Sequence, residues 1–287
     1  MLPEFDLVEP RALGDALKVM AEDGGKTAPL AGGTNVLVDL RTGRAAYDRL
    51  VSLQHLSELR GLGTANGRII LGARTTLTDL VYDCRIGAAA PGLAAAARVF
   101  AGAMVRNVAT IAGNVCSASP AADLVPPLMA LEAEVVLQST AGERAVPLDQ
   151  FYPGVHQTVR RNDELVTSFR WTRRPERSAH NFYKLALRKG DAIAVTSVAV
   201  LLGAEGGTCT TARIALGAVA PVVMRVPEAE RILMGEVLTD AVMEKAASIA
   251  AQACRPIDDI RASAEYRRHA VGVLVRRLAG QAWQSIC

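Results

Sequence analysis

The sequence predicts an α+β protein of two domains, the second smaller than the first. The chain has 287 residues, enough for two hydrophobic cores. A charged, proline-containing stretch without hydrophobic periodicity, at residues 173–177, marks the expected boundary. Beyond it, strand-like segments come first and helical segments follow, which is typical of a small α+β domain. We therefore expect one domain over residues 1–176 and a second over residues 177–287.

The first domain is expected to begin with an amphipathic helix. Apolar residues recur at helical spacing from Leu13 to Met20, behind Pro10, and the pair Gly24-Gly25 is expected to end the helix. Asn66-Gly67 is a hairpin turn signal. Strands are expected over residues 27–30, 50–53, 68–73 and 135–137, and helices over 76–82 and 92–100.

In the second domain, three strand-like segments precede two long helical patterns. The expected strands cover residues 181–187, 194–202 and 210–219, and the expected helices cover 228–253 and 262–283. Aromatic residues make up only 4% of the chain, so we expect a core built mainly from small and branched aliphatic side chains.

The charge balance argues against nucleic-acid binding, because 32 basic residues face 29 acidic ones and the net charge is only +3. The late arginine pairs, Arg267-Arg268 and Arg276-Arg277, are interpreted as a solvated helix face or a subunit contact. The first ten residues lack the basic and apolar regions of a signal peptide, and no apolar run is long enough to span a bilayer. We therefore expect a soluble, cytoplasmic protein without a transmembrane segment.

The cysteines predict free thiols rather than a metal centre. No two of the five are spaced as CxxC, which argues against iron–sulfur or zinc ligation within this chain. The odd number and wide spacing favour reduced thiols. They stand at Cys84, Cys116, Cys209, Cys254 and Cys287.

A glycine pair interrupts the apolar run PLAGGTNVLVDL at residues 29–40. Gly32-Gly33 allow positive φ angles and close approach of another molecule, and Thr34 is a candidate cap for a short helix over residues 35–40. Exposed amide groups at such a turn attract anions. The stretch is neither a Walker loop nor GxGxxG, so a phosphate cradle and a plain tight turn both remain open.

A second segment, residues 99–123, combines small and polar side chains without clear periodicity. Two such loops about 80 residues apart could hold a diphosphate from both sides, and Asp123 suits a ribose hydroxyl. Asp123 is also a candidate N-cap for a helix over residues 124–133, and both roles can hold together. The small and polar side chains of the second segment are Thr110, Gly113, Asn114, Ser117, Ser119 and Asp123.

At these two loops the sequence resembles the FAD-binding medium subunit of the molybdenum hydroxylases, the family of the carbon monoxide dehydrogenase flavoprotein and the FAD segment of xanthine dehydrogenase. The family pattern Ala-Gly-Gly-Thr/His-Asn/Ser is found at residues 31–35. Arg-Asn-x-Ala-Thr-Ile-Gly-Gly-Asn is similar to residues 106–114, and Ala-Ser-Pro-x-x-Asp to residues 118–123. One departure is Ala112, which replaces the first glycine of the second pair and would resist a positive φ angle.

The resemblance continues through most of the chain. Phe-Ala-Gly at residues 100–102, Asp-Glu-Leu-Val at 163–166 and Lys-x-x-x-Arg-x-x-Asp at 184–191 are similar to family segments around the flavin. Residues 261–278 resemble the family's C-terminal helix.

The resemblance implies a two-part FAD-binding domain of the PCMH type, followed by a small domain with an antiparallel sheet and C-terminal helices. It also implies an electron-transfer role in a complex, a dimer of heterotrimers. FAD would take electrons from two [2Fe–2S] clusters in a small subunit, supplied by a molybdopterin cofactor in a large subunit, and pass them to an external acceptor. This chain alone would not oxidise organic substrates.

The resemblance also implies roles for individual residues. The loops at 31–35 and 110–114 would hold the pyrophosphate, and Asp123 a ribose or ribityl hydroxyl. Lys184 would lie near the flavin ring, where a cation stabilises reduced, anionic flavin. No catalytic residue or metal ligand is expected. The expected cofactor-binding residues are Leu30, Ala31, Gly32, Gly33, Thr34, Asn35, Phe100, Ala101, Ala109, Thr110, Gly113, Asn114, Ser119, Asp123, Val166, Lys184, Asp191 and Ile193.

Two alternatives stay open. One is a stand-alone flavin oxidase of the same FAD fold, although the region after residue 177 is short and poor in aromatic residues and histidine. The other is a non-catalytic assembly subunit that has lost flavin, for which Ala112 is the sequence support. The substrate of the complex and the terminal acceptor are not determined by this sequence.

Overall fold

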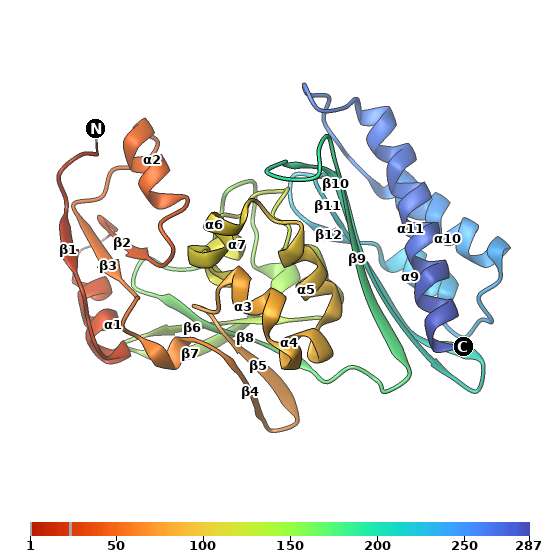
Figure 1. Cartoon of the computed structure of the whole chain (residues 1–287), viewed down its shortest axis with the longest axis horizontal. Coiled ribbons are helices and arrows are strands. Elements are labelled where there is room, and N and C mark those ends of the chain that lie inside the picture. The colour runs from red at the N-terminus through yellow and green to blue at the C-terminus, as the bar shows by residue number, and fades with distance from the viewer. Residues whose placement is uncertain (1, 23–24) are drawn as a thin grey trace.

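Three sheets follow one another along the molecule, each with its own helices (Figure 1). The computed structural model describes residues 2–22 and 25–287, and it confirms the expected α+β class. The first two sheets are built before residue 173 and the third after residue 177. The exact division at residues 176 and 177 stays a prediction.

The first sheet is small and parallel, with strand order β1-β3-β2. Helix α1 packs onto it through buried Ala16, Leu17 and Met20, which confirms the expected amphipathic face. Of the two glycines expected to end this helix, Gly24 lies outside the described residues and Gly25 has φ +113°. The elements are β1 (Asp6–Val8), α1 (Leu13–Ala21), β2 (Thr27–Leu30), α2 (Val36–Thr42) and β3 (Arg49–Ser52).

The second sheet is antiparallel, with order β4-β5-β8-β6-β7, and a series of short helices packs beside it. The predicted hairpin turn is present, since Asn66 and Gly67 have φ +51° and +74° between β4 and β5. The strands are β4 (Leu62–Ala65), β5 (Arg68–Gly72), β6 (Glu134–Ser139), β7 (Gly142–Pro147) and β8 (Leu165–Thr172). The helices are η1 (Ser57–Leu59), α3 (Leu77–Tyr82), α4 (Cys84–Ala89), α5 (Pro91–Arg98), α6 (Ala103–Val108), α7 (Ile111–Cys116), α8 (Val125–Ala130) and η2 (Leu148–Gln150).

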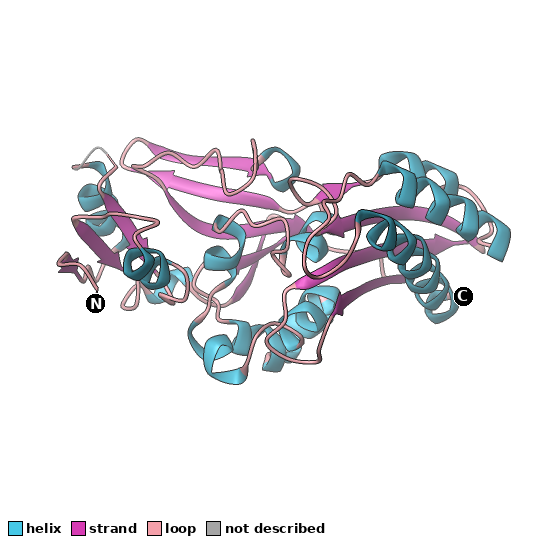
Figure 2. Cartoon of the chain, turned by 90° about the horizontal axis from the view of Figure 1, so that it is seen from above, coloured by secondary structure: helices cyan, strands magenta, loops and turns pink. Residues whose placement is uncertain are grey.

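The third sheet is antiparallel, with order β12-β11-β10-β9, and it joins the two halves of the chain. On one face, Val198 and Val200 of β10 pack with the C-terminal helices, whereas Ala199 and Leu201 pack into the core of the second sheet. Figure 2 shows helices on both sides of these strands. The elements are β9 (Ser178–Ala186), β10 (Ala194–Glu205), β11 (Thr208–Gly217), β12 (Met224–Arg225), α9 (Pro227–Leu233), α10 (Asp240–Ala253) and α11 (Ala264–Ile286).

The prediction of a single helix over residues 228–253 is wrong. Helix α9 ends at Leu233, and Gly235 follows with φ +81°, a left-handed conformation that no helix continues through. A new helix, α10, then begins behind Thr239, whose hydroxyl accepts a hydrogen bond from the Val242 N–H at 3.4 Å.

Candidate functional site

The first glycine loop lies directly against the second. A Cβ atom on Gly32 would come within 2.0 Å of the carbonyl oxygen of Val108, at the end of α6, so only glycine allows this contact. Gly33 has φ +72°, a left-handed conformation that also favours glycine. The backbone of this loop therefore meets the backbone of the second loop, as the two-loop hypothesis requires.

Thr34 does not cap the following helix, so that expectation is wrong. Asn35 occupies the N-cap position of α2 with φ −108° and ψ −55°, and no side chain caps the helix. Thr34 and Ala31 are half-buried and Asn35 is exposed. Neither Thr34 nor Asn35 caps α2 through its side chain, and Ala31 packs against the core around α1.

The second loop is held by hydrogen bonds to the segment that follows β5. The N–H of Leu77 donates to the Ala109 carbonyl and the N–H of Ile111 donates to the Thr75 carbonyl, both at 3.0 Å. Thr110 caps α7, since its hydroxyl accepts a hydrogen bond from the Gly113 N–H at 3.1 Å. These hydrogen bonds join the second loop to the segment after β5 and to the start of α7.

Ala112 fits the second loop without strain. It lies inside α7 (Ile111–Cys116), is absent from the left-handed φ region, and its N–H donates to the Ala73 carbonyl at 3.1 Å. Gly113 beside it is exposed, and a Cβ there would meet only the Thr110 hydroxyl, at 3.2 Å. The alanine therefore leaves the loop geometry intact.

Asn114 and Ser119 shape the turn that leads to Asp123. The Asn114 side-chain oxygen accepts a hydrogen bond from the Leu124 N–H at 3.1 Å, and the Ser119 hydroxyl accepts one from the Ala121 N–H at 3.2 Å. Asp123 is not the N-cap of α8, because Leu124 occupies that position and no side chain caps the helix. The capping interpretation of Asp123 is wrong.

Asp123 instead forms a buried ion pair with Lys184 of β9. The Asp123 Oδ2 to Lys184 Nζ distance is 2.6 Å, and each side chain is only 5% exposed. The other carboxylate oxygen, Oδ1, is buried and has no hydrogen-bond partner among the described residues. Burial raises the pKa of Asp123 to about 6, and the ammonium group of Lys184 opposes this rise.

Phe100 and Ala101 lie beside the turn between β9 and β10. Arg106 donates from Nη1 to both of their carbonyl oxygens at 2.8 Å, a contact that sequence reasoning missed although Arg106 stands in the second motif. The Asp191 carboxylate oxygens lie 3.4 and 3.5 Å from the position of a Cβ on Gly102. Segments about 90 residues apart are thus brought together here.

Val166 and Ile193 occupy different environments. Val166 of β8 is 6% exposed and packs in the core of the second sheet, whereas Ile193 is 55% exposed. Beside Val166, the Thr167 carbonyl accepts a hydrogen bond from the Ala73 N–H at 3.0 Å, and Ala73 in turn binds the second loop. Leu30 packs in a small core at the end of β2.

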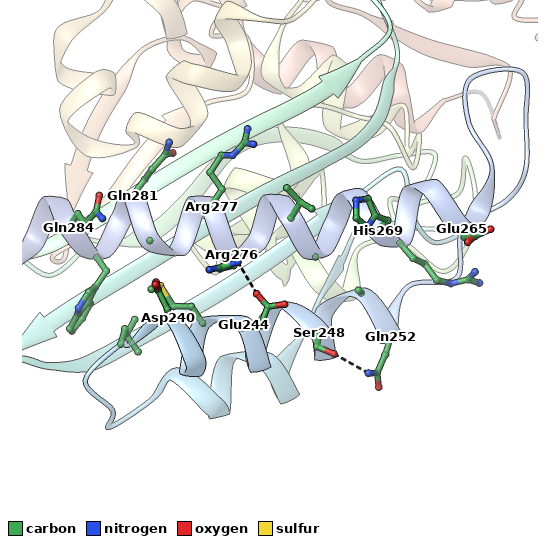
Figure 3. A pocket seen from close by; sticks show the side chains of 18 residues that line it. Asp240, Glu244, Ser248, Gln252, Glu265, His269, Arg276, Arg277, Gln281 and Gln284 are labelled. Atoms are coloured by element: carbon green, nitrogen blue, oxygen red, sulfur yellow. Dashed lines mark hydrogen bonds and ion pairs between the residues drawn. The ribbon is translucent and has the colours of Figure 1, made fainter.

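A groove between the C-terminal helices lies away from these residues. It has a volume of about 990 Å³ between α10 and α11, where Arg276 pairs with Glu244 at 3.2 Å (Figure 3). A second cavity of about 700 Å³ lies at the end of α5 and along β9, next to Lys184. Within residues 2–22 and 25–287, no group of three or more His, Cys, Asp or Glu side chains could hold a metal ion, and no helix is long and apolar enough to cross a membrane.

Two family models match the chain. The model described as "FAD binding domain in molybdopterin dehydrogenase" covers residues 3–171, and "CO dehydrogenase flavoprotein C-terminal domain" covers residues 181–282. The carbon monoxide dehydrogenase medium chain of Hydrogenophaga pseudoflava is 31% identical over 281 residues, 98% of each chain. The xanthine dehydrogenase FAD-binding subunit of Escherichia coli O157:H7 is 31% identical over 274 residues, which are 94% of this chain and 93% of that subunit.

Solved structures give the same result. The structure of carbon monoxide dehydrogenase from Hydrogenophaga pseudoflava that lacks the Mo-pyranopterin moiety matches with a TM-score of 0.95 at 31% identity, over 100% of both chains. Quinoline 2-oxidoreductase from Pseudomonas putida 86 matches with a TM-score of 0.92 at 28% identity, over 100% of this chain and 99% of that one.

The fold and its loops define a flavoprotein of the two-domain FAD-binding class. The chain belongs to the FAD-binding medium-subunit family of the molybdenum hydroxylases, and it is an oxidoreductase subunit with FAD as its cofactor.

Proposed function

We propose that this chain holds FAD between its two glycine loops and serves as the electron-transfer subunit of a cytoplasmic molybdenum hydroxylase complex. When bound, FAD supplies the capacity to take electrons from the [2Fe–2S] clusters of a small subunit and release them to an external acceptor. A large subunit with a molybdopterin cofactor completes the heterotrimer, and two heterotrimers form a dimer. The relatives named as medium chains and FAD-binding subunits support this assignment.

The main observation that supports the proposed cofactor site is the unpaired Oδ1 of Asp123. A buried carboxylate oxygen without a donor is costly, and a ribose or ribityl hydroxyl would supply the missing hydrogen bond. Lys184 holds the opposite oxygen and keeps the carboxylate oriented. The residues present therefore fit FAD.

The remaining residues would act mainly through their backbone and shape. The loops at residues 31–35 and 110–114 would offer N–H groups to the pyrophosphate, with Ala109 leading into the second loop. Phe100 and Ala101 would line the adenine end, and Val166 would pack against the flavin ring. Asp191 and Ile193 would lie beside the ring.

No observation favours the two alternatives. Ala112 was the support for a subunit that has lost flavin, and this residue sits unstrained in α7. The cavity beside Lys184 adjoins the proposed flavin site, whereas the groove of about 990 Å³ lies on the C-terminal helices, away from that site. A stand-alone oxidase needs a substrate pocket beside the flavin, and the groove on the C-terminal helices does not provide one.

Purification from the native host tests the proposal. We expect the chain to co-purify with an iron–sulfur subunit and a molybdenum subunit, and the complex to lose substrate oxidation when this chain is removed. The flavin-loaded chain alone should not oxidise aldehydes or heteroaromatic compounds. Isolation of a monomeric chain that turns over such a substrate would overturn the proposal in favour of the oxidase.

A further inference from the structure

The guanidinium group of Arg267, on α11, is almost completely buried, with 2% exposure. Nη1 donates to the carbonyl oxygens of Val195 and Ala218, the latter at 3.0 Å, and Nη2 donates to Asp259 Oδ1 at 2.7 Å. Asp259 also accepts a hydrogen bond from the Arg261 N–H at 2.8 Å, so the carboxylate that orients Arg267 is itself held. A buried charge is stable in a protein when it is paired and bonded in this way.

One of the two carbonyl acceptors of Arg267, Ala218, connects it to the segment that carries Ser119 and Asp123. Ala218 has φ +62°, a left-handed conformation that alanine rarely adopts, and its N–H donates to the Pro120 carbonyl at 2.7 Å. Hydrogen bonds on both sides of Ala218 thus hold a strained residue in place.

The other carbonyl acceptor, Val195, connects Arg267 to the turn that carries Asp191 and Ile193. The pairing of β9 with β10 shifts register between Ala194 and Thr196, so Val195 stands at an irregular position of the ladder. Its carbonyl is bonded by Arg267 at the point where β10 leaves the turn.

We infer that Arg267 is a positioning residue of the cofactor site, because its buried guanidinium bonds the Val195 carbonyl of segment 191–195 directly and is linked through Ala218 to segment 119–123. Without it, the buried carbonyl of Val195 and the partly buried carbonyl of Ala218 lose a charged donor, and both segments gain freedom to move. Asp123 would then no longer present its unpaired oxygen at a fixed position beside Lys184. The effect on FAD rests on the proposed function, whereas the hold on the two segments does not.

The full chain with Arg267→Lys tests the inference, because lysine keeps the charge but lacks the two forked Nη groups. In the flavin-free chain we expect hydrogen exchange of the Ala218 amide, and of amides in residues 117–124 and 190–196, to accelerate by about tenfold or more. FAD should bind about tenfold more weakly, which corresponds to about 1.4 kcal/mol, with a shifted visible spectrum of the bound flavin.

The matched control is Glu230→Gln in the same domain. Glu230 is also buried, accepts a hydrogen bond from the Ile214 N–H at 2.9 Å and pairs with Arg225, and no hydrogen bond joins it to either site segment within the described residues. We expect this variant to lose stability but to keep the exchange rates of both segments and its FAD affinity within about twofold.

Asp259→Asn provides a milder change if Arg267→Lys does not fold, because it keeps the side-chain shape and removes the negative charge that pairs with Arg267 and with Arg261. Exchange rates in both segments that match those of the Glu230→Gln control would overturn the inference. If the unaltered chain binds no FAD, the proposed function fails, and the exchange measurement still decides the role of Arg267.

Discussion

At the residue scale, Asp123 and Lys184 link the two halves of the chain inside the candidate site. Asp123 precedes α8 in the first half and Lys184 lies on β9 in the second, with 2.6 Å between Oδ2 and Nζ. Since both side chains are buried, each charge depends on the other. The same pair therefore joins the two halves of the chain and, through the free Oδ1, would contribute to the proposed binding of FAD.

Substitution of this pair separates the two roles. Asp123→Asn leaves a buried ammonium group without a counter-charge and should lower the free energy of unfolding by about 3–5 kcal/mol. The double variant with Lys184→Met should recover most of that loss but should still bind FAD about tenfold more weakly, because the carboxylate acceptor is absent. Urea denaturation of the flavin-free chain and a FAD titration measure both. A double variant with unaltered FAD affinity would remove Asp123 from the site.

Two glycines of the loops are predicted to behave differently. Gly32→Ala places a Cβ 2.0 Å from the Val108 carbonyl oxygen and should separate the loops, with loss of FAD binding. Gly113→Ala meets only a hydroxyl at 3.2 Å and should leave folding unchanged. Circular dichroism with flavin content distinguishes them. If Gly32→Ala retains full flavin occupancy, the contact between the loops is not required for binding.

A larger side chain at position 113 tests whether the exposed face of α7 meets the cofactor. Gly113→Val should prevent FAD binding in a chain that remains folded, because the β-branched side chain would block the approach of the pyrophosphate. Normal flavin occupancy in this variant would show that α7 does not face FAD, and Gly113→Ala serves as the control for the helix itself.

At the element scale, helix α5 packs on strand β9 over a buried histidine. His180 is 2% exposed, and its ring lies near the Pro127 backbone without a hydrogen bond of good geometry among the described residues. A Cβ on Gly92 of α5 would lie 2.7 Å from its Nε2, so glycine permits this close approach. Burial, with a contribution from nearby Arg174, lowers the pKa of His180 to about 3.

The contribution of His180 to the stability of the flavin-free chain should therefore fall in mild acid. The unfolded chain takes up a proton on His180 near pH 6.5 and the folded chain does not, so the stabilising contribution of neutral His180 is present above pH 6.5 and is lost as the pH falls toward 3. Between pH 8 and pH 5 the His180 contribution to the free energy of unfolding should fall by about 2 kcal/mol. Asp123 acts in the opposite direction, since its raised pKa makes stability fall as the pH rises from about 4 to 6.

The comparison of the unaltered chain with His180→Leu isolates the histidine, because Asp123 is common to both. Urea denaturation at pH 5, 6, 7 and 8 should give a stability difference that changes with pH in the stated direction. Parallel pH profiles for the two proteins would contradict a neutral buried His180.

Most elements could be predicted from local patterns, and the failures have physical causes. The helix from Leu13 and the hairpin at Asn66-Gly67 depend on side-chain periodicity and turn chemistry, which the sequence carries directly. The break at Gly235 and the partners of Thr34 and Asp123 depend on tertiary contacts instead. Secondary-structure propensity could not show that the Asp123 side chain does not cap α8 and instead pairs with a lysine 61 residues further along the chain.

At the scale of the whole molecule, the third sheet joins the two halves, because β10 is buried on both faces. Its continuous apolar sequence predicted a strand but not which domains would cover it. The glycine motifs likewise predicted two ligand-facing loops. Arg267 was expected on a solvated helix face or at a subunit contact but is buried, and the contacts of Arg106 were found only from the structure. Interactions between distant segments are what the sequence did not reveal.

The central claim is that two loops and Asp123 together bind a dinucleotide flavin. Titration of the flavin-free chain with FAD and with FMN tests it most directly. We expect one FAD per chain and FMN binding weaker by about 100-fold or more, since FMN lacks the adenosine half and the pyrophosphate that both loops would hold. Equal affinity for FMN, or no binding of FAD, would contradict the two-loop site.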